Sequence, residues 1–185
     1  MKQLKEDEKL NPLIEEYGEL ALEKSDNPFQ SLVASIINQQ LSTASAESIR
    51  SKFFERFEIT PASLLKAGEE DLAECGLSSQ KIDYIQAISE TFLEDGLNEQ
   101  TFAEMSDNEV VDELTGIHGV GVWTAKMFLI NVLGREDVFP VEDLGIRRAM
   151  ENLYSLESRG DMRDKAEEWK PYRSYASLYL WRSRD

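Results

Sequence analysis

Carboxylates and glycines stand at spacings that could serve catalysis and phosphate binding. Glu142 and Asp143 come just after Pro140, within a stretch that runs from residue 137 to 148. We expect a helix to begin here with the carboxylate in its first turn, where the helix dipole favours the ionised form. Such a residue usually does no more than stabilise a helix, and from spacing alone both carboxylates are candidates for catalysis.

The stretch Ile117–Ala125 contains two glycines one residue apart, Gly119 and Gly121. Because neither has a Cβ, the backbone can form a tight hairpin and come close to a partner, while the amides of the following helix point outward. These features predict a binding site for a phosphate group. A Gly-x-Gly pair between two helices is more often a plain turn, so its neighbours must support the interpretation.

Two further stretches have unusual patterns. In Ile36–Ala44, the apolar face of a helix is broken by Asn-Gln-Gln-Leu and restarted by Ser42, which predicts an exposed corner between two helices. Near the C-terminus, residues 169–182 are dense in aromatic side chains. We expect most of these side chains to lie in the core.

Helices must position all of these residues. Apolar side chains recur at helical spacing throughout, and no alternating run of β-branched residues is long enough for a sheet. Helix starts are predicted at Pro28, at Pro61 and at Ser106, whose capping box with Glu109 predicts a helix over residues 107–115. Helix ends are predicted at Gly68, Gly76, Gly96 and Gly134. The fold class is therefore all-α, with about ten short helices.

Length and composition allow one ordinary domain or two small lobes: the chain has 185 residues, of which 41% are hydrophobic and 30% charged. No apolar run approaches the ~20 residues of a membrane span. The N-terminus lacks a secretory signal, so we expect a cytoplasmic protein that does not engage a membrane. The single cysteine, Cys75, excludes an internal disulfide and a cysteine-ligated iron–sulfur cluster. With His118 as the single histidine, we expect no metal site.

The net charge of −16 argues at first against a nucleic-acid partner, because phosphate binding usually shows as a basic surface. The surplus is unevenly spread along the chain. Residues 61–116 carry 14 acidic and 2 basic side chains and residues 1–27 carry 8 and 4, which together account for all of it. We therefore expect any anion site within residues 28–60, 117–134 or 135–185. The acidic surplus also leaves open a host that is rich in salt.

Taken together, these stretches resemble the helix-hairpin-helix (HhH-GPD) superfamily of DNA glycosylases, in particular the 3-methyladenine DNA glycosylase II type. Residues 117–125 resemble the hairpin of the family, with His118 where the family usually has Pro, and Phe139–Leu144 resembles its catalytic segment. The other matching segments are Gln39–Ser42, Gly76–Lys81 and Trp169–Arg182. The matches span residues 28–182, and the chain resembles the compact members, which lack an additional N-terminal β domain.

The resemblance implies a role for individual residues. Asp143 is implied as the catalytic carboxylate, and Trp123, Trp181 and Tyr172 as the pocket that holds a flipped base. Gln40 is implied to enter the minor groove and fill the gap that the flipped nucleotide leaves. The residues implied in DNA binding are Gln39, Gln40, Leu41, Ser42, Gly119, Val120, Gly121 and Thr124.

The implied function is that of a monofunctional DNA glycosylase in base excision repair, which flips an alkylated purine out of double-stranded DNA and hydrolyses its N-glycosidic bond. The implied lesions are of the 3-methyladenine and 7-methylguanine type. The implied fold has two helical lobes, residues 28–134 and residues 1–27 with 135–185, and an active-site cleft between them. We expect a monomer without an organic cofactor. The resemblance allows a monovalent cation at the hairpin carbonyls.

Strand cleavage is not expected from this chain. Bifunctional members of the superfamily carry a Lys two residues after the second hairpin glycine, and its amine forms a Schiff base with the sugar. Here that position is Trp123. Lys126 lies three residues further along the helix, where its side chain points in another direction.

Two alternatives from another class of function are open. The chain could bind damaged DNA through the hairpin without catalysis, or its carboxylates could imitate DNA and occupy another protein. Few carboxylates lie in the segments that resemble the glycosylase family, which disfavours imitation of DNA. The presence of Asp143 favours the enzyme over a non-catalytic DNA-binding protein. The sequence leaves open whether hypoxanthine or ethenoadenine is also removed.

Overall fold

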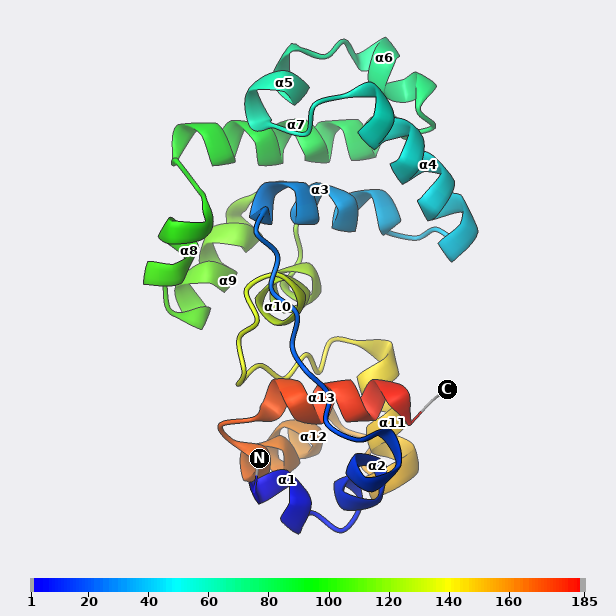
Figure 1. Ribbon diagram of the computed structural model, residues 1–185, viewed down its shortest axis with the longest axis vertical. Helices are drawn as coiled ribbons and strands as arrows, with labels where there is room; N and C mark the ends of the chain where they lie inside the picture. The colour runs from blue at the N-terminus through cyan, green and yellow to red at the C-terminus, as the bar shows by residue number, and fades with distance from the viewer. Residues whose placement is uncertain (1, 184–185) are drawn as a thin grey trace. The chain divides into compact units, whose positions relative to one another are not determined.

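Helices form all of the regular structure in residues 2–183, the residues that the computed structural model describes (Figure 1). This range holds thirteen α-helices and one short 3-10 helix, so the all-α class is confirmed, with more helices than expected. The chain divides into two compact units. Unit 1 contains the residues before 25 and those from 129 onward, and unit 2 contains residues 25–128. Both boundaries lie a few residues before those expected from the sequence.

Unit 2 contains the predicted corner and hairpin and is built around its longest helix, α7 (Ser79–Glu94). Its other helices are α3 (Pro28–Asn38), α4 (Thr43–Arg56), α5 (Pro61–Lys66), α6 (Glu69–Glu74), α8 (Glu99–Glu104) and α9 (Asp107–Gly116). Helix α10 (Val122–Asn131) follows the hairpin and continues into unit 1. Helices α3, α5 and α6 pack on α7, and α3 also contacts α4 (Figure 1).

The core of unit 2 contains a chain of aromatic contacts between distant segments. Phe92 of α7 packs against Phe29 of α3 with ring centroids 5.3 Å apart, and against Phe102 of α8 at 5.8 Å. Phe102 in turn lies edge-on to Phe128 of α10 at 5.1 Å. Such contacts stabilise a core beyond the burial of apolar area. They tie the helix before the corner to the helix after the hairpin.

Unit 1 is assembled from both ends of the chain. Its helices are α1 (Lys2–Glu6), α2 (Leu10–Tyr17), α11 (Leu144–Tyr154), α12 (Arg159–Ala166), the 3-10 helix η1 (Glu167–Trp169) and α13 (Arg173–Arg182). Helix α13 packs against α2 and α11 (Figure 1), and it also contacts η1. Trp169 and Tyr179 are completely buried, whereas the other three aromatic residues of this stretch pack against the same core and stay partly exposed.

The core of unit 1 also contains a buried carboxylate, Asp7. Its Oδ2 accepts the indole N–H of Trp169 at 2.9 Å and pairs with the ammonium of Lys165 at 3.0 Å. Its Oδ1 accepts the hydroxyl of Tyr154 at 2.7 Å. Burial raises the pKa of Asp7, but these hydrogen bonds, with one from the Lys9 amide, outweigh it and lower the pKa to about 2. The carboxylate therefore ties α1, α11, α12 and η1 together.

Side-chain caps begin helices where the sequence predicts them. Asn27 accepts the amide of Gln30 at 3.0 Å. Ser106 and Glu109 form the predicted capping box, and α9 covers the predicted range with one further residue. The predicted helix end at Gly68 is wrong. This glycine is the N-cap of α6, because α5 ends two residues earlier.

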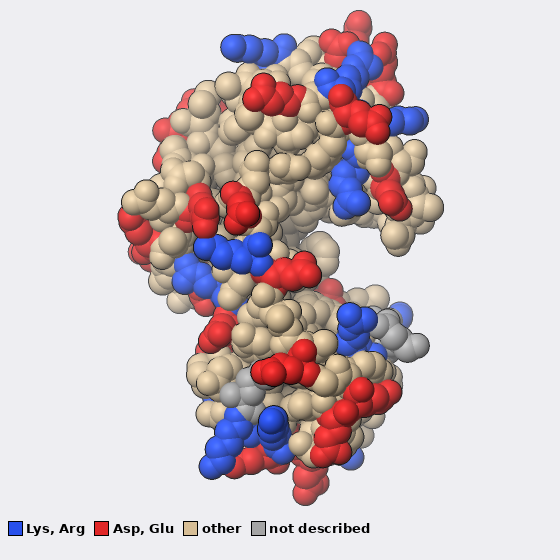
Figure 2. All heavy atoms as spheres, in the orientation of Figure 1, with Lys and Arg blue, Asp and Glu red and all other residues tan. Residues whose placement is uncertain are grey.

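Acidic and basic side chains are interspersed on the face shown in Figure 2. On unit 2, Arg56 of α4 forms 2.6 Å ion pairs with both Asp71 and Glu74 of α6. Part of the acidic surplus in residues 61–116 is thus paired with a base from outside that stretch. No helix in the described part of the chain is both long enough and apolar enough to cross a membrane.

Candidate functional site

Asp143 is held at the N-terminus of α11 by two hydrogen bonds to one oxygen. As the N-cap, its Oδ1 accepts the amide of Ile146 at 2.9 Å. The same Oδ1 accepts the indole Nε1–H of Trp181, on α13, at 3.0 Å. The sequence predicts the carboxylate in the first turn of the helix, and this is wrong by one residue. Asp143 lies just before the first turn, because its side chain accepts a helical amide that lacks a backbone partner. Both donors and the helix dipole stabilise negative charge on this half-buried group.

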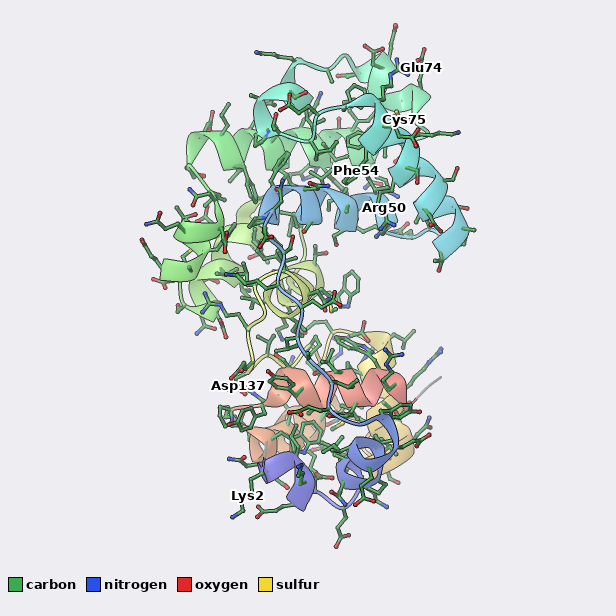
Figure 3. The ribbon with its side chains drawn as sticks, in the orientation of Figure 1. Lys2, Arg50, Phe54, Glu74, Cys75 and Asp137 are labelled. Carbon is green, nitrogen blue, oxygen red and sulfur yellow. The ribbon has the colours of Figure 1, made fainter. Side chains whose placement is uncertain are left out.

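The loop that leads into α11 is anchored to the start of α13. Arg173 Nε and Nη2 bind the two carboxylate oxygens of Asp137 at 2.7 and 3.1 Å, and Asp137 lies beside that end of α13 in Figure 3. The buried hydroxyl of Ser174 accepts the amide of Val138 at 2.9 Å and donates to the carbonyl of Arg135 at 2.6 Å. Sequence reasoning misses these residues, because partners 36 positions apart form no local pattern.

Of the aromatic residues predicted for the base pocket, Trp181 is brought to Asp143. Trp181 also lines a cavity of about 410 Å³ in unit 1, together with residues 20–23. Tyr172 caps the opposite end of α13, about 14 Å along the helix axis. Its ring packs edge-on against Tyr175 at 6.1 Å. A pocket role for Tyr172 stays a prediction, whereas Trp181 stands in contact with the candidate carboxylate.

Trp123 is the second residue of α10 and lies in unit 2. Its surface is 39% exposed, which argues against the alternative that it is a core residue. Two neighbours among the residues predicted to bind DNA are buried instead. Thr124 and Val120 are only 3% and 5% exposed, so their side chains face the interior. Their part in DNA binding stays a prediction, and with buried side chains any such contact would be made by their backbone.

The predicted corner lies between α3 and α4. The hydroxyl of Ser42 accepts the amide of Ser45 at 3.3 Å and begins α4. Gln40 has a φ of +56°, a left-handed conformation that non-glycine residues rarely adopt. Gln40 and Leu41 are exposed, and Gln39 is half-buried. The structure therefore presents Gln40 and Leu41 together at one turn of the chain, as the sequence predicts.

The hairpin is a type II turn. The Val120 amide donates to the Ile117 carbonyl at 3.1 Å, so His118 and Gly119 are the two central residues. Gly119 has a φ of +92°, and a type II turn requires a positive φ at that position. His118 is exposed, and its ring lies edge-on to Tyr84 with centroids 5.0 Å apart. The turn leads directly into α10.

The two hairpin glycines are needed for different reasons. A Cβ on Gly119 would lie 2.2 Å from the ring of Tyr84, whereas a Cβ on Gly121 would meet nothing within 4 Å. The approach of a partner to both glycines stays a prediction, but the lack of a Cβ has a different reason at each. The space beside Gly119 is filled by Tyr84 of the same chain, and the open space lies beside Gly121.

A family model for the HhH-GPD superfamily of base excision DNA repair proteins matches residues 33–172. That range contains the corner, the hairpin and Asp143. The chain therefore belongs to this superfamily, and the family and fold class that the sequence resembles are confirmed.

Individual proteins and solved structures agree with the family match. The chain is 29% identical over 186 residues to a putative DNA-3-methyladenine glycosylase of Bacillus subtilis, which covers 94% of this chain and 65% of that protein. The crystal structure of a DNA-3-methyladenine glycosidase from Bacillus halodurans matches with a TM-score of 0.87 and 36% identity, over 98% of this chain and 87% of that one. The 3-methyladenine DNA glycosylase Mag1 of Schizosaccharomyces pombe, in complex with abasic DNA, matches with a TM-score of 0.85 and 28% identity, over 98% and 95%.

Proposed function

We propose that this chain, a DNA glycosylase of base excision repair, hydrolyses the N-glycosidic bond of alkylated purines in double-stranded DNA and leaves the backbone intact. The observation that carries the proposal is the Asp143 carboxylate, fixed by the amide of Ile146 and the indole of Trp181. Relatives named DNA-3-methyladenine glycosylases support the lesion class.

The chemistry requires a fixed negative charge. Breaking the bond between a purine and its deoxyribose builds positive charge on the sugar, as in the hydrolysis of glycosides. A carboxylate that is already ionised and held in place stabilises this charge without reorganising during the reaction. The same group can orient and deprotonate the water that attacks the sugar. We assign both roles to Asp143.

The lesion supplies part of the driving force. A purine alkylated at N3 or N7 carries a positive charge, so it leaves without strong protonation by a general acid. Electron-rich rings attract such a base by stacking and cation–π contact, worth roughly 0.5–2 kcal/mol per ring. We assign this recognition to Trp181, whose indole is oriented by its bond to Asp143, and to the exposed Trp123. Weak stacking and pairing of the damaged nucleotide add selectivity before extrusion.

DNA is the partner of this chain, in line with the complex of Mag1 with abasic DNA. We assign the minor groove contact to the exposed Gln40 and Leu41, with Gln40 filling the gap in the stack. The backbone around Gly121, at the start of α10, is assigned to a phosphate. Both segments lie in parts of the sequence that carry none of the acidic surplus.

The reaction stops at the abasic site in this proposal. Trp123 stands where a bifunctional member has the lysine that attacks the sugar, and an indole cannot form an imine. Incubation with a methylated duplex and sodium borohydride tests the point: no covalent adduct is expected, and strands should break only after treatment with alkali. A trapped protein–DNA adduct would contradict the assignment.

The central experiment removes the charge of Asp143. Asp143→Asn should lower single-turnover release of 7-methylguanine and 3-methyladenine by about 100-fold or more, while duplex affinity stays near that of the wild type. Glu142→Gln is the matched control, because it removes the neighbouring carboxylate and should retain activity. Release by Asp143→Asn at the wild-type rate would exclude Asp143 as the catalytic carboxylate. Duplex binding by a wild type that releases no base would favour a non-catalytic damage-binding protein.

Three further features are part of the proposal. We propose a monomer in the cytoplasm, which size-exclusion chromatography with light scattering and cell fractionation can check. A monovalent cation at the hairpin carbonyls is also proposed. One of these carbonyls, that of Ile117, already accepts the amide of Val120 within the turn. Dependence of duplex affinity on the choice of K⁺ or Li⁺ at constant ionic strength tests the cation.

A further inference from the structure

The segment Gly76–Lys81, which leads into α7, contains a lysine that reaches back to the corner. Lys81 Nζ donates to the carbonyl of Ile37 at 2.7 Å and to that of Gln39 at 2.9 Å. These two carbonyls belong to the last turn of α3 and to the first residue after it. Both would otherwise lack a helical amide as partner. A side chain more than 40 positions away thus satisfies the end of the helix that precedes Gln40.

The cost of this contact shows that Lys81 is more than a surface charge. The residue is half-buried, and burial lowers the pKa of its amine because the charged form loses water. The two carbonyls and the negative end of the α3 dipole offset that loss. An ammonium that served only solubility would stay in solvent, as the exposed Lys66 of α5 does.

The backbone that Lys81 holds is the strained part of the corner. Gln40 follows directly with a φ of +56°, which costs free energy for a residue with a Cβ. Such a conformation persists only when its surroundings fix it. The side chains that the corner presents, Gln40 and Leu41, are exposed and do not contribute to the core. The contact with Lys81 therefore fixes where the backbone of the corner lies, and it does not bury the corner's side chains.

The same helix also supports the hairpin. Tyr84 lies one turn after Lys81 on α7, and its ring fills the space beside the Cα of Gly119. The edge of His118 packs on the same ring. Within the described residues, the hydroxyl of Tyr84 accepts a hydrogen bond from the side-chain amide of Gln80, at 2.6 Å, and makes none to the hairpin. The ring therefore supports the turn.

We propose that Lys81 and Tyr84 are positioning residues, which fix the corner and the hairpin relative to each other so that both meet one DNA duplex. This inference rests on the proposed function, because it assigns the corner to the gap in the base stack. It predicts that loss of Lys81 impairs the use of duplex DNA and spares the chemistry at Asp143.

The test compares excision from a duplex with excision from the same lesion in a single strand, which needs no filling of a gap. Lys81→Met should lower the duplex-to-single-strand ratio of single-turnover rates roughly tenfold. Gln40→Ala should lower the same ratio, and the double variant should fall no further than the lower single variant, because Lys81 acts through the corner. Lys81→Arg should recover part of the ratio. Lys66→Met removes an equal charge elsewhere on unit 2 and should leave the ratio unchanged.

A second measurement separates this inference from the proposed function. A duplex with 2-aminopurine beside an abasic-site analogue reports entry of a side chain into the stack by its fluorescence, without catalysis. The wild type should change that fluorescence, and Lys81→Met should reduce the change. A wild-type ratio or fluorescence change in Lys81→Met would overturn the role of Lys81, even if base release occurs as proposed. Equal losses of rate on duplex and single strand would also overturn it, because they indicate a general defect.

The hairpin part of the inference has its own matched pair. Tyr84→Ala should weaken binding to undamaged duplex several-fold, because the turn loses the ring that supports it. Tyr84→Phe keeps the ring and loses one hydroxyl bond to Gln80, so its affinity should match that of the wild type. Wild-type affinity in Tyr84→Ala, or equal losses in both variants, would overturn the role of the ring.

Discussion

The two units position their functional groups by different means. In unit 1 the proposed catalytic group is a side chain, Asp143, held by a hydrogen bond from α13, while Arg173 and Ser174 anchor the preceding loop to the same helix. In unit 2 the segments proposed to bind DNA are two turns of the backbone, the corner that presents Gln40 and the hairpin. Lys81 and Tyr84 of α7 support these turns. In both units, one helix supports segments that are distant from it in sequence.

The difference follows from what each unit has to do. A carboxylate that stabilises a transition state must keep its place closely, because a shift of about 1 Å can cost 100-fold in rate. Hydrogen bonds of fixed length between side chains meet that need. A turn that approaches a phosphate needs an exposed backbone, so its supporting side chains lie behind it. Variants of the residues that hold Asp143 in unit 1 should therefore change the rate of base release. Variants of the residues that support the corner and the hairpin in unit 2 should change the use of duplex DNA.

The largest effect is expected at a glycine of unit 2. Gly119→Ala should destabilise the fold by about 3 kcal/mol or more, because the new Cβ requires a strained φ and overlaps the ring of Tyr84. Gly121→Ala should leave stability nearly unchanged, because open space surrounds that position. Thermal melts of the two variants measure the difference. Equal stability of both would mean that the ring of Tyr84 does not support the hairpin.

The next effect concerns the bond between Trp181 and Asp143. Trp181→Phe keeps an aromatic ring and removes the N–H donor, so base release should fall roughly 10- to 100-fold with duplex affinity unchanged. Tyr175→Phe is the control on the same helix, because it removes a hydroxyl bond to Glu136 and leaves Asp143 untouched. A loss of duplex affinity in Trp181→Phe would contradict the expectation that variants of the residues that hold Asp143 change the rate of base release and not the binding of duplex DNA.

A second carboxylate of unit 1 should affect stability and not rate. The pKa of Asp7 is lowered to about 2 in the folded protein, from 3.8. The ionised Asp7 therefore contributes fully to the free energy of unfolding above about pH 4, and this contribution is lost as the pH falls through 2. The shift in pKa corresponds to about 2 kcal/mol. Denaturant unfolding of the wild type and of Asp7→Asn between pH 6 and pH 2.5 measures the difference in their free energies of unfolding. The stability gap should narrow as the pH falls; a constant gap would contradict the assignment.

Sequence reasoning finds the parts of the site that local chemistry specifies. Caps such as Ser106 and the turn at Gly119 leave a signal within a few residues, so α9 and the hairpin are predicted closely. The bonds of Trp181 to Asp143 and of Lys81 to the corner leave none, because their partners are 38 and more positions apart. Burial is also set by the whole fold. The sequence therefore does not show that the side chain of Thr124, just after the hairpin, faces the core.

The smallest effect is expected where this chain departs from its family, at His118. Ile117 has an extended backbone, with φ −79° and ψ 130°, which suits a following proline, and proline is favoured at this position of a type II turn. His118→Pro should therefore gain about 0.4–1 kcal/mol from the unfolded state. It should lose the edge contact with Tyr84, worth about 0.5–1.5 kcal/mol. The two effects nearly cancel, so the melting temperature should change by a few degrees at most.

His118→Ala is the matched control, because it loses the ring without the gain from proline and should melt slightly lower than His118→Pro. Both variants keep the turn, so both should bind an undamaged duplex as the wild type does. Gel-shift titration at fixed salt measures the affinity. A similar drop in both variants would show that the imidazole itself meets the DNA. The hairpin would then meet DNA through a side chain as well as through its backbone, and the contrast with unit 1 would be weaker at the hairpin.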